Sequence, residues 1–299
     1  MRRIANSAAA IAALLLSSFA HAATFHTREV IHQEMSLYRN IVVSEGDNHR
    51  CMTFGRFSGR QSCIQLDAPG KLVLDYTQGL LSALYVQPEP HRILVIGLGG
   101  GMLPMALHHV YPQAQIDAVE IDPAVLDVAE RYFGFAPNAQ VHAYVEDGRM
   151  FVRRQGRAGV QYDVIMIDAF DKDYIPEHML TVEFLTQVSA ILAPHGVVAS
   201  NTFNGPLTPY ETSTYQAAFK SVRAVDVTGG NRIILAVRDG HLDLGVMAST
   251  ARSLDNVLAP TSVSSSLLVP EMKDLPWVTD VHPLTDQFSP ANLLLKYEH

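Results

Sequence analysis

The sequence is poor in the residues that several classes of enzyme require. Its 299 residues include only two cysteines and one tryptophan. Histidine and cysteine residues do not occur at the spacing of a zinc site, and the adjacent His108 and His109 cannot face one metal from a single helix. The G-x-S-x-G motif of serine hydrolases is also missing. We therefore expect no metal and no serine nucleophile of that kind.

Excess positive charge is missing as well. The chain has 22 Lys and Arg against 30 Asp and Glu, a formal net charge of −8. A mildly acidic chain does not attract nucleic acid or anionic membranes. Beyond the N-terminus there is no apolar run long enough to span a bilayer. We expect no nucleic-acid partner, and no membrane partner once the chain is processed.

The N-terminal 22 residues, MRRIANSAAAIAALLLSSFAHA, differ from the rest. Two arginines precede an apolar run that ends at Ala20-His21-Ala22, the pattern of a cleavable signal peptide. The run is shorter than the roughly 20 residues of a membrane span, although an uncleaved anchor remains the alternative. We predict a signal peptide over residues 1–22 and a periplasmic or secreted mature chain.

The two cysteines lie at equal distances from a predicted turn near residues 56–58. Short strand-like runs flank this turn, so Cys51 and Cys63 are expected to face each other across a hairpin. Opposed strand positions are close enough for a disulfide, and an exported chain meets an oxidising compartment. We predict a Cys51–Cys63 disulfide. The alternative is two small buried residues in a chain that stays in the cytosol.

Two patterns divide the chain. Short alternating runs predict a small antiparallel β-domain within residues 23–70, and a linking helix follows over residues 71–87. From residue 92, strands and helices alternate, and the strands are almost continuously apolar. This rhythm predicts an α/β fold over residues 71–299: a Rossmann-like, doubly wound, mostly parallel sheet, as in class I methyltransferases. We also expect a helix over residues 215–222 and irregular structure in the last thirty residues.

The first strand of the alternating region runs into glycines, in LVIGLGGG over residues 94–101. Ligands of such sheets bind beyond the carboxyl ends of the strands, and Gly97, Gly99 and Gly101 let the backbone approach a ligand closely. A dinucleotide fingerprint is G-x-G-x-x-G, whereas Met102 stands at its last position here. We infer a nucleoside without a pyrophosphate.

Acidic residues end the next two predicted strands. Glu120, in VEIDP, can accept hydrogen bonds from both hydroxyls of a ribose, and Asp147, in VEDGR, can accept one from an adenine amino group. Acids at such positions also cap helices. The glycine cluster, Glu120 and Asp147, in this order at successive strand ends, indicate an adenosine-type ligand such as S-adenosylmethionine.

The fourth strand ends in DAFDKD, which brings Asp168 and Asp171 to the same edge of the sheet. A sulfonium is already an activated electrophile, so the protein need only orient the attacking group and accept its proton. Carboxylates bind a cationic amine and can take that proton. We predict a small cationic amine as substrate. Asp171 and Asp173 could instead belong to a solvated acidic loop.

Several motifs together carry a family resemblance: YRNIVV, LDYTQGLLSAL, the glycine cluster, VEIDP, EDG and DAFD. In this order they resemble the polyamine aminopropyltransferase (spermidine synthase) family. The resemblance implies that Glu120 and Asp147 bind the nucleoside, Asp168 activates the amine, Asp171 binds the polyamine and Tyr76 lines the pocket. It also implies a homodimer that moves an aminopropyl group from decarboxylated S-adenosylmethionine to putrescine.

The sequence departs from that family at the donor site. Gly100 stands where the family has an acid that holds the donor's free amine, and Arg39 replaces an expected glutamine. Without the acid, the carboxylate of intact S-adenosylmethionine is no longer repelled, and Arg39 would favour it if it reached the pocket. The sequence therefore leaves two alternatives open: an S-adenosylmethionine-dependent methyltransferase on the same scaffold, and a non-catalytic periplasmic binding protein.

Overall fold

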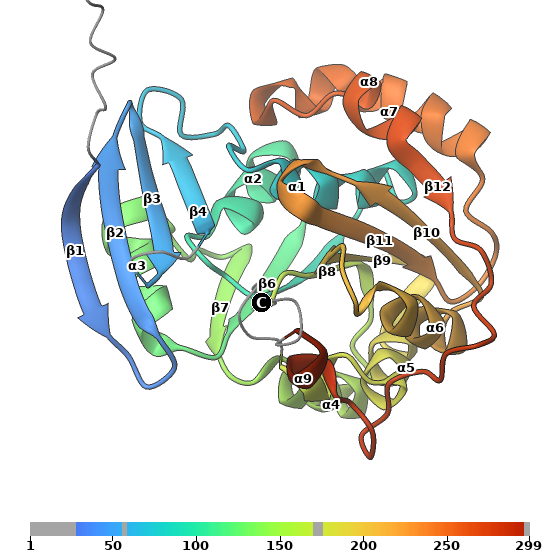
Figure 1. The fold of residues 1–299 in the computed structure, drawn as a ribbon. Helices are drawn as coiled ribbons and strands as arrows, with labels where there is room; N and C mark the ends of the chain where they lie inside the picture. Colours follow the sequence, from blue (N-terminus) through green and yellow to red (C-terminus); the bar gives the residue numbers. More distant parts are fainter. Residues whose placement is uncertain (1–27, 56–58, 170–175, 296–299) are drawn as a thin grey trace, which may run out of the picture.

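The computed structural model describes residues 28–55, 59–169 and 176–295, and Figure 1 shows their arrangement. The predicted signal peptide over residues 1–22, the turn at 56–58 and Asp171 lie outside the described residues. Within the described ranges, none of the helices combines the length and the apolar character that crossing a membrane requires.

The N-terminal strands form a four-stranded antiparallel sheet in the order β1-β2-β3-β4, as predicted (Figure 1). The strands are β1 (Glu29–Met35), β2 (Asn40–Gly46), β3 (His49–Phe54) and β4 (Arg60–Gln65). Ile41, Val43 and Met52 on this sheet pack against Val128 and Phe133 of helix α3 (Pro123–Phe133). The small sheet therefore buries its apolar face against the larger unit.

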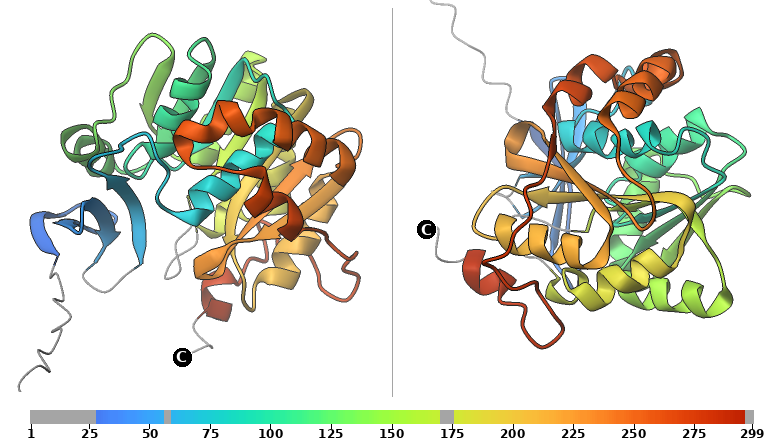
Figure 2. Two further views of the ribbon diagram at one scale, coloured as in Figure 1. Left: turned by 90° about the horizontal axis from the view of Figure 1, so that it is seen from above. Right: turned by 90° about the vertical axis from the view of Figure 1, so that its right-hand side faces the viewer.

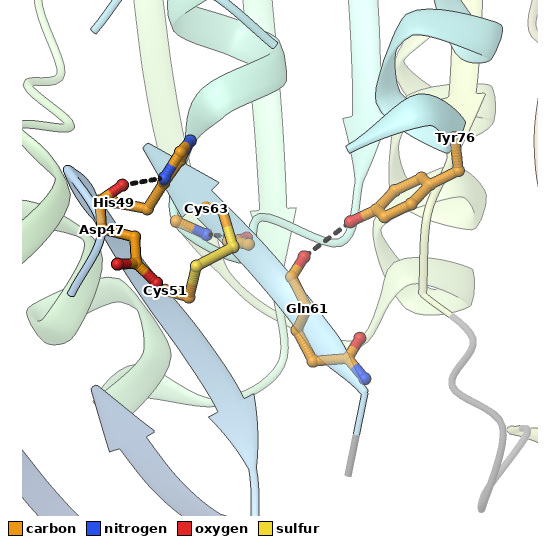
Figure 3. Close-up of a disulfide and its surroundings, with 8 residues drawn as sticks. Asp47, His49, Cys51, Gln61, Cys63 and Tyr76 are labelled. Atoms are coloured by element: carbon orange, nitrogen blue, oxygen red, sulfur yellow. Dashed lines mark hydrogen bonds between the residues drawn. A yellow bond between two sulfur atoms is a disulfide. The ribbon is translucent and has the colours of Figure 1, made fainter. Parts of the chain in front are cut away.

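The predicted disulfide is confirmed. In the register of β3 and β4, Cys51 pairs with Cys63. Their sulfur atoms are bonded and their Cα atoms lie 4.1 Å apart (Figure 3). Both cysteines are buried. The hairpin of β3 and β4 is therefore closed by a covalent bond.

The second sheet has eight strands in the order β12-β10-β11-β9-β8-β5-β6-β7. Their bounds are β5 (Arg92–Ile96), β6 (Gln115–Glu120), β7 (Val141–Val145), β8 (Tyr162–Ile167), β9 (Leu192–Phe203), β10 (Ser221–Asp226), β11 (Asn231–Val237) and β12 (Met272–Asp274). Strands β7, β6, β5, β8 and β9 pair in parallel, whereas β11, β10 and β12 pair antiparallel. The carboxyl ends of the parallel strands therefore meet at one edge.

Helices cover both faces of this sheet, as Figures 1 and 2 show. One face carries α1 (Asp75–Leu80), the 3-10 helix η1 (Leu81–Tyr85), α2 (Met102–Val110) and α7 (Leu244–Leu258). The other carries α4 (Gly148–Ala158), α5 (Val182–Ala190) and α6 (Thr208–Ala218). Short helices complete the chain: η2 (Glu177–Met179), η3 (Thr228–Gly230), η4 (Ala259–Thr261), α8 (Ser265–Leu268), η5 (Val269–Glu271) and α9 (Ala291–Leu295). The Rossmann-like prediction is confirmed.

Three local predictions were wrong. The helix expected over residues 215–222 ends at Ala218, because Ser221 and Val222 pair with β11 as part of β10. The last thirty residues contain β12, which pairs with β10, and α9. The linking helix is shorter than residues 71–87 and splits into α1 and η1. In each case tertiary pairing or packing overrides the local pattern.

We expect the disulfide to contribute substantially to stability. Its cysteines are 12 residues apart, and closing such a loop in the unfolded chain corresponds to about 3 kcal/mol. The Cys51→Ser/Cys63→Ser variant should therefore lose about that much free energy of unfolding in urea titrations. Reductant should weaken the wild type by a similar amount and leave the double variant unchanged. Equal stability of the two proteins would rule out this contribution.

Candidate active site

The glycine turn after β5 is shaped by close approach to the protein itself. Gly97 has φ +95°, and a Cβ on it would lie 2.1 Å from the main-chain oxygen of Asp168. The N–H of Asp168 in turn donates to the carbonyl of Ile96 at 2.7 Å. A Cβ on Gly99 would lie 2.5 Å from Ser62 Oγ, and one on Gly101 2.5 Å from the Phe135 ring. These glycines let the turn pack closely against β4 and against the residues just beyond the ends of β8 and α3.

A cleft opens at the carboxyl ends of the parallel strands and is bordered by the N-terminal sheet. It brings together most of the residues predicted from the sequence, and its lining includes Arg39, Tyr76, Gly97, Gly99, Glu120, Asp147 and Asp168. Gly101 is instead the N-cap residue of α2, outside the cleft lining. The four strand ends predicted to form one site therefore do converge.

Glu120 is held rigidly at the end of β6. Its two carboxylate oxygens accept hydrogen bonds from the N–H groups of Leu98 at 3.1 Å and Asp122 at 3.0 Å. Desolvation raises the pKa of Glu120, while these hydrogen bonds and the charge of Arg39 lower it. Each oxygen retains a lone pair, so the carboxylate can accept from two adjacent hydroxyl groups.

Asp147 serves a helix as well as the cleft. One carboxylate oxygen caps α4 by accepting from the N–H of Met150 at 2.9 Å. The other lies 2.8 Å from Nε2 of His178, which also lines the cleft. The capping role was an alternative open from the sequence, whereas His178 was not predicted, because it lies in η2 and follows no motif. The pair forms one wall of the cleft.

Asp168 lies just past the end of β8, partly buried. In the parallel register Ile167 pairs with Ser200, so Asp168 lies beside Asn201 of β9, whose Nδ2 donates to Asp168 Oδ1 at 2.9 Å. Desolvation is the largest cause that raises the pKa of Asp168, and with the charge of Glu120, and against the opposing hydrogen bond from Asn201, it brings this pKa to about 7. Such a carboxyl group exchanges a proton near neutral pH.

Two side-chain amides that were not predicted from the sequence lie behind Asp168. Asn201 is buried, and its side-chain oxygen Oδ1 accepts a hydrogen bond from Asn231 Nδ2 of β11 at 2.9 Å. Two side-chain amides in series, Asn231 and Asn201, thus support the Asp168 carboxylate by hydrogen bonds without adding a charge. The only signal in the sequence was a polar residue inside an apolar strand, in GVVASNTF.

Tyr76 connects the cleft to the N-terminal sheet. Its hydroxyl donates to the main-chain oxygen of Gln61 on β4 at 2.6 Å (Figure 3). Desolvation and the nearby charge of Asp168 raise the pKa of Tyr76 well above its ordinary value, so the hydroxyl keeps its proton. Gln61 is two residues from Cys63, so the disulfide hairpin borders the site.

The two departures from the family pattern, Gly100 and Arg39, make contacts of different kinds. The Gly100 N–H donates to Ser62 Oγ at 2.7 Å, and a Cβ on Gly100 would lie 3.0 Å from the Phe133 ring. The guanidinium of Arg39 stacks over Phe54, 4.1 Å from its ring centroid, on the side of Glu120. Gly100 is therefore packed into the protein, and Arg39 does reach the cleft.

Among the residues that the structure describes, no three His, Cys, Asp or Glu side chains are grouped so that they could hold a metal ion.

Comparison with known proteins agrees with this geometry. Residues 80–228 match the family model described as spermine/spermidine synthase domain. A polyamine aminopropyltransferase of Vibrio vulnificus is 38% identical over 275 residues, which cover 89% of this chain and 91% of that protein. The human eEF1A lysine and N-terminal methyltransferase is 40% identical over 133 residues, but these cover only 40% of this chain and 19% of that protein.

Two solved structures share the fold. A probable spermidine synthase from Corynebacterium glutamicum has a TM-score of 0.69 at 20% identity and covers 86% of this chain and 97% of its own. The human methyltransferase-like protein 13, solved in complex with SAH, has a TM-score of 0.57 at 26% identity and covers 72% and 100%. Relatives thus include both transferase types, but the long match is to an aminopropyltransferase.

The contact of Gly97 with Asp168 leads to a test by substitution. Gly97→Ala forces a Cβ against a main-chain oxygen, so we expect a loss of at least about 3 kcal/mol in the free energy of unfolding. Gly134→Ala is the matched control, because Gly134 also has a positive φ, +71°, but open space around it. It should cost only about 1–2 kcal/mol for the left-handed backbone. Similar losses in urea titrations would contradict the role assigned to the contact.

Proposed function

Because the chain belongs to the spermidine synthase family of polyamine aminopropyltransferases, we propose that it transfers an aminopropyl group from decarboxylated S-adenosylmethionine to a polyamine such as putrescine. One observation carries this proposal: Asp168, with a pKa near 7, faces a cleft whose other acids suit a nucleoside. Such an acid can hold a cationic amine and then accept its proton.

The arrangement of the acids supports a donor that lies across the strand ends. Asp147, beside α4, would accept from the adenine amino group, and Glu120 from the two ribose hydroxyls. The sulfonium would then lie near Asp168, over the turn at Gly97 and Gly99, where no Cβ intrudes. The negative charges of Glu120 and Asp168 would also stabilise the sulfonium before reaction.

The chemistry then needs one base. The amine nitrogen attacks the methylene carbon next to sulfur, and the carbon–sulfur electrons return to sulfur, leaving neutral methylthioadenosine. The proton lost by the nitrogen passes to the Asp168 carboxylate, which Asn201 holds in place. Tyr76 keeps its own proton, so it can donate but not act as the base. The remaining work is positioning and exclusion of water.

The position of Arg39 supports the decarboxylated donor. Its guanidinium lies over Phe54, and its charge lowers the pKa of Glu120. Arg39 therefore lies beside the acid that we assign to the ribose. The end of the cleft at Asp168 carries a carboxyl group, which disfavours a second carboxylate on the donor. The position of Arg39 thus opposes the preference for intact S-adenosylmethionine that the sequence suggested. The methyltransferase alternative is further weakened because those relatives match only part of the chain.

The proposal includes action outside the cytoplasm. The signal-peptide pattern of residues 1–22 motivates it, and the Cys51–Cys63 disulfide supports it, since such bonds persist mainly in oxidising compartments. A donor made inside cells would then have to reach the enzyme from elsewhere.

Calorimetry with three nucleosides tests the function. We expect the purified mature protein to bind decarboxylated S-adenosylmethionine and methylthioadenosine at least about tenfold more tightly than intact S-adenosylmethionine, a difference of ~1.4 kcal/mol. Asp168→Asn should abolish aminopropyl transfer to putrescine while binding methylthioadenosine as well as the wild type does. Failure to bind any of the three at millimolar concentration would refute the proposed function.

The pH profile tests the role of Asp168 and Asn201. Only the carboxylate can accept the proton, so kcat/KM should fall as the pH drops below about 7. Asn201→Ala removes a hydrogen bond that lowers this pKa, and a bond to a charged group is worth about 1.5–3 kcal/mol. The acidic limb should therefore move up by about 1–2 pH units.

The control for that experiment is Asn204→Ala. Asn204 lies three residues further along and also donates its amide to a carboxylate, that of Asp226, at 3.1 Å. This exposed pair is separate from the cleft residues, so its loss should leave the pH profile unchanged. An unchanged profile in Asn201→Ala would exclude the positioning role of that amide.

A further inference from the structure

The segment that follows Pro283 is tied to the cleft by an unusually well bonded carboxylate. Asp286 accepts two hydrogen bonds from the guanidinium of Arg149, at 2.7 and 2.6 Å, and a third from the Thr181 hydroxyl at 2.7 Å. Its N–H donates to Glu183 at 3.0 Å. The two bonds from Arg149 form a planar fork, which fixes the relative geometry of both side chains.

A second set of contacts holds the short helix η2. The N–H of Asn292 donates to the Glu177 carboxylate at 2.9 Å, and the N–H of Val182 donates to the carbonyl of Leu284 at 2.9 Å. Leu284 and Ala291 are fully buried in the core on this face of the sheet. Residues 284–295, which include α9 in Figure 1, therefore contact η2 at its first residue and the chain just after its end.

These contacts continue into the cleft. Arg149 also donates to the main-chain oxygen of His178 at 3.0 Å, and the His178 ring lies 2.8 Å from Asp147. Asp147, His178 and Met179 all line the cleft. A continuous path of hydrogen bonds thus runs from Asp286 through Arg149 and His178 to Asp147.

Loss of Asp286 would disturb this path directly. The Arg149 side chain is only 14% exposed, so it has given up most of its hydration and depends on its carboxylate partner. Glu183 and Asp147 are the other carboxylates whose charges act on Arg149. Without Asp286, the guanidinium would turn toward these acids and compete for the oxygen atoms of Asp147.

We propose that residues 284–295 form a strap that fixes the adenine side of the nucleoside site, with Asp286 and Arg149 as positioning residues. The proposal rests on the proposed function, since it takes Asp147 as the acid that faces the adenine amino group. Neither residue touches the reacting atoms, so the strap should act on nucleoside affinity and leave the chemical step unchanged.

A strap that merely stabilised the fold would give a different result, and the chain offers a matched control. Asp274 in β12 also makes an ion pair, with one carboxylate oxygen 2.8 Å from the buried guanidinium of Arg223, and it ties another C-terminal segment to the sheet. Neither Asp274 nor Arg223 lines the cleft. Asp274→Asn should therefore cost stability while leaving nucleoside binding unchanged.

The experiment is calorimetry with methylthioadenosine on wild type, Asp286→Asn and Asp274→Asn, together with steady-state kinetics. We expect Asp286→Asn to weaken methylthioadenosine binding at least about tenfold, a difference of ~1.4 kcal/mol, and to raise the donor KM similarly. Its kcat and its KM for the amine should stay within about twofold, whereas Asp274→Asn should bind like the wild type.

Arg149→Lys provides a second variant that keeps the charge but loses the fork. It should bind methylthioadenosine with an affinity between those of the wild type and Asp286→Asn. Wild-type affinity in folded Asp286→Asn, or an equal loss in Asp274→Asn, overturns the strap alone. If the wild type itself does not bind the nucleoside, the proposed function fails, and the strap fails with it.

Discussion

The site depends on one contact, the main chain of Asp168 lying against the turn at Gly97. The Asp168 N–H bonds to Ile96, and no Cβ fits between Gly97 and the Asp168 carbonyl. This contact positions Asp168 so that its side chain lines the cleft beside the ends of the neighbouring strands. Gly99 and Gly100 of the same turn lie against the Ser62 side chain of β4, so the turn also joins the N-terminal sheet to the larger one.

The N-terminal sheet is for this reason part of the site. Its strand β4 supplies Gln61, which receives the Tyr76 hydroxyl, and Ser62, which receives the Gly100 N–H. The disulfide fixes the same strand one residue later, at Cys63. Because β4 forms these bonds with Tyr76 of α1 and with the glycine turn, loosening the hairpin would reach the cleft through Gln61 and Ser62.

What could be predicted from the sequence follows from its regular topology. Parallel strands align their carboxyl ends, so Glu120, Asp147 and Asp168 were bound to meet once the βα rhythm was recognised. Cys51 and Cys63 were readable because a hairpin pairs residues at equal distances from its turn. Partners set by register between distant strands, such as Asn201 and Asn231, leave no local pattern. Asp286 is invisible for the same reason, since Arg149 lies far away in the chain.

Two acids of the cleft, Asp168 and Asp147, are supported in chemically different ways, and the difference fits their proposed tasks. Asp168 is oriented by the amides of Asn201 and Asn231, which fix its direction without a full positive charge. A lysine or arginine there would lower the pKa of Asp168 far more and weaken it as a base. Asp147 instead caps α4 and lies 2.8 Å from the His178 ring, with the charge of Arg149 nearby, so its oxygen atoms are fixed as hydrogen-bond acceptors. Support by neutral amides suits the acid that we propose exchanges a proton, and fixed acceptor oxygens suit the acid that we propose only accepts hydrogen bonds.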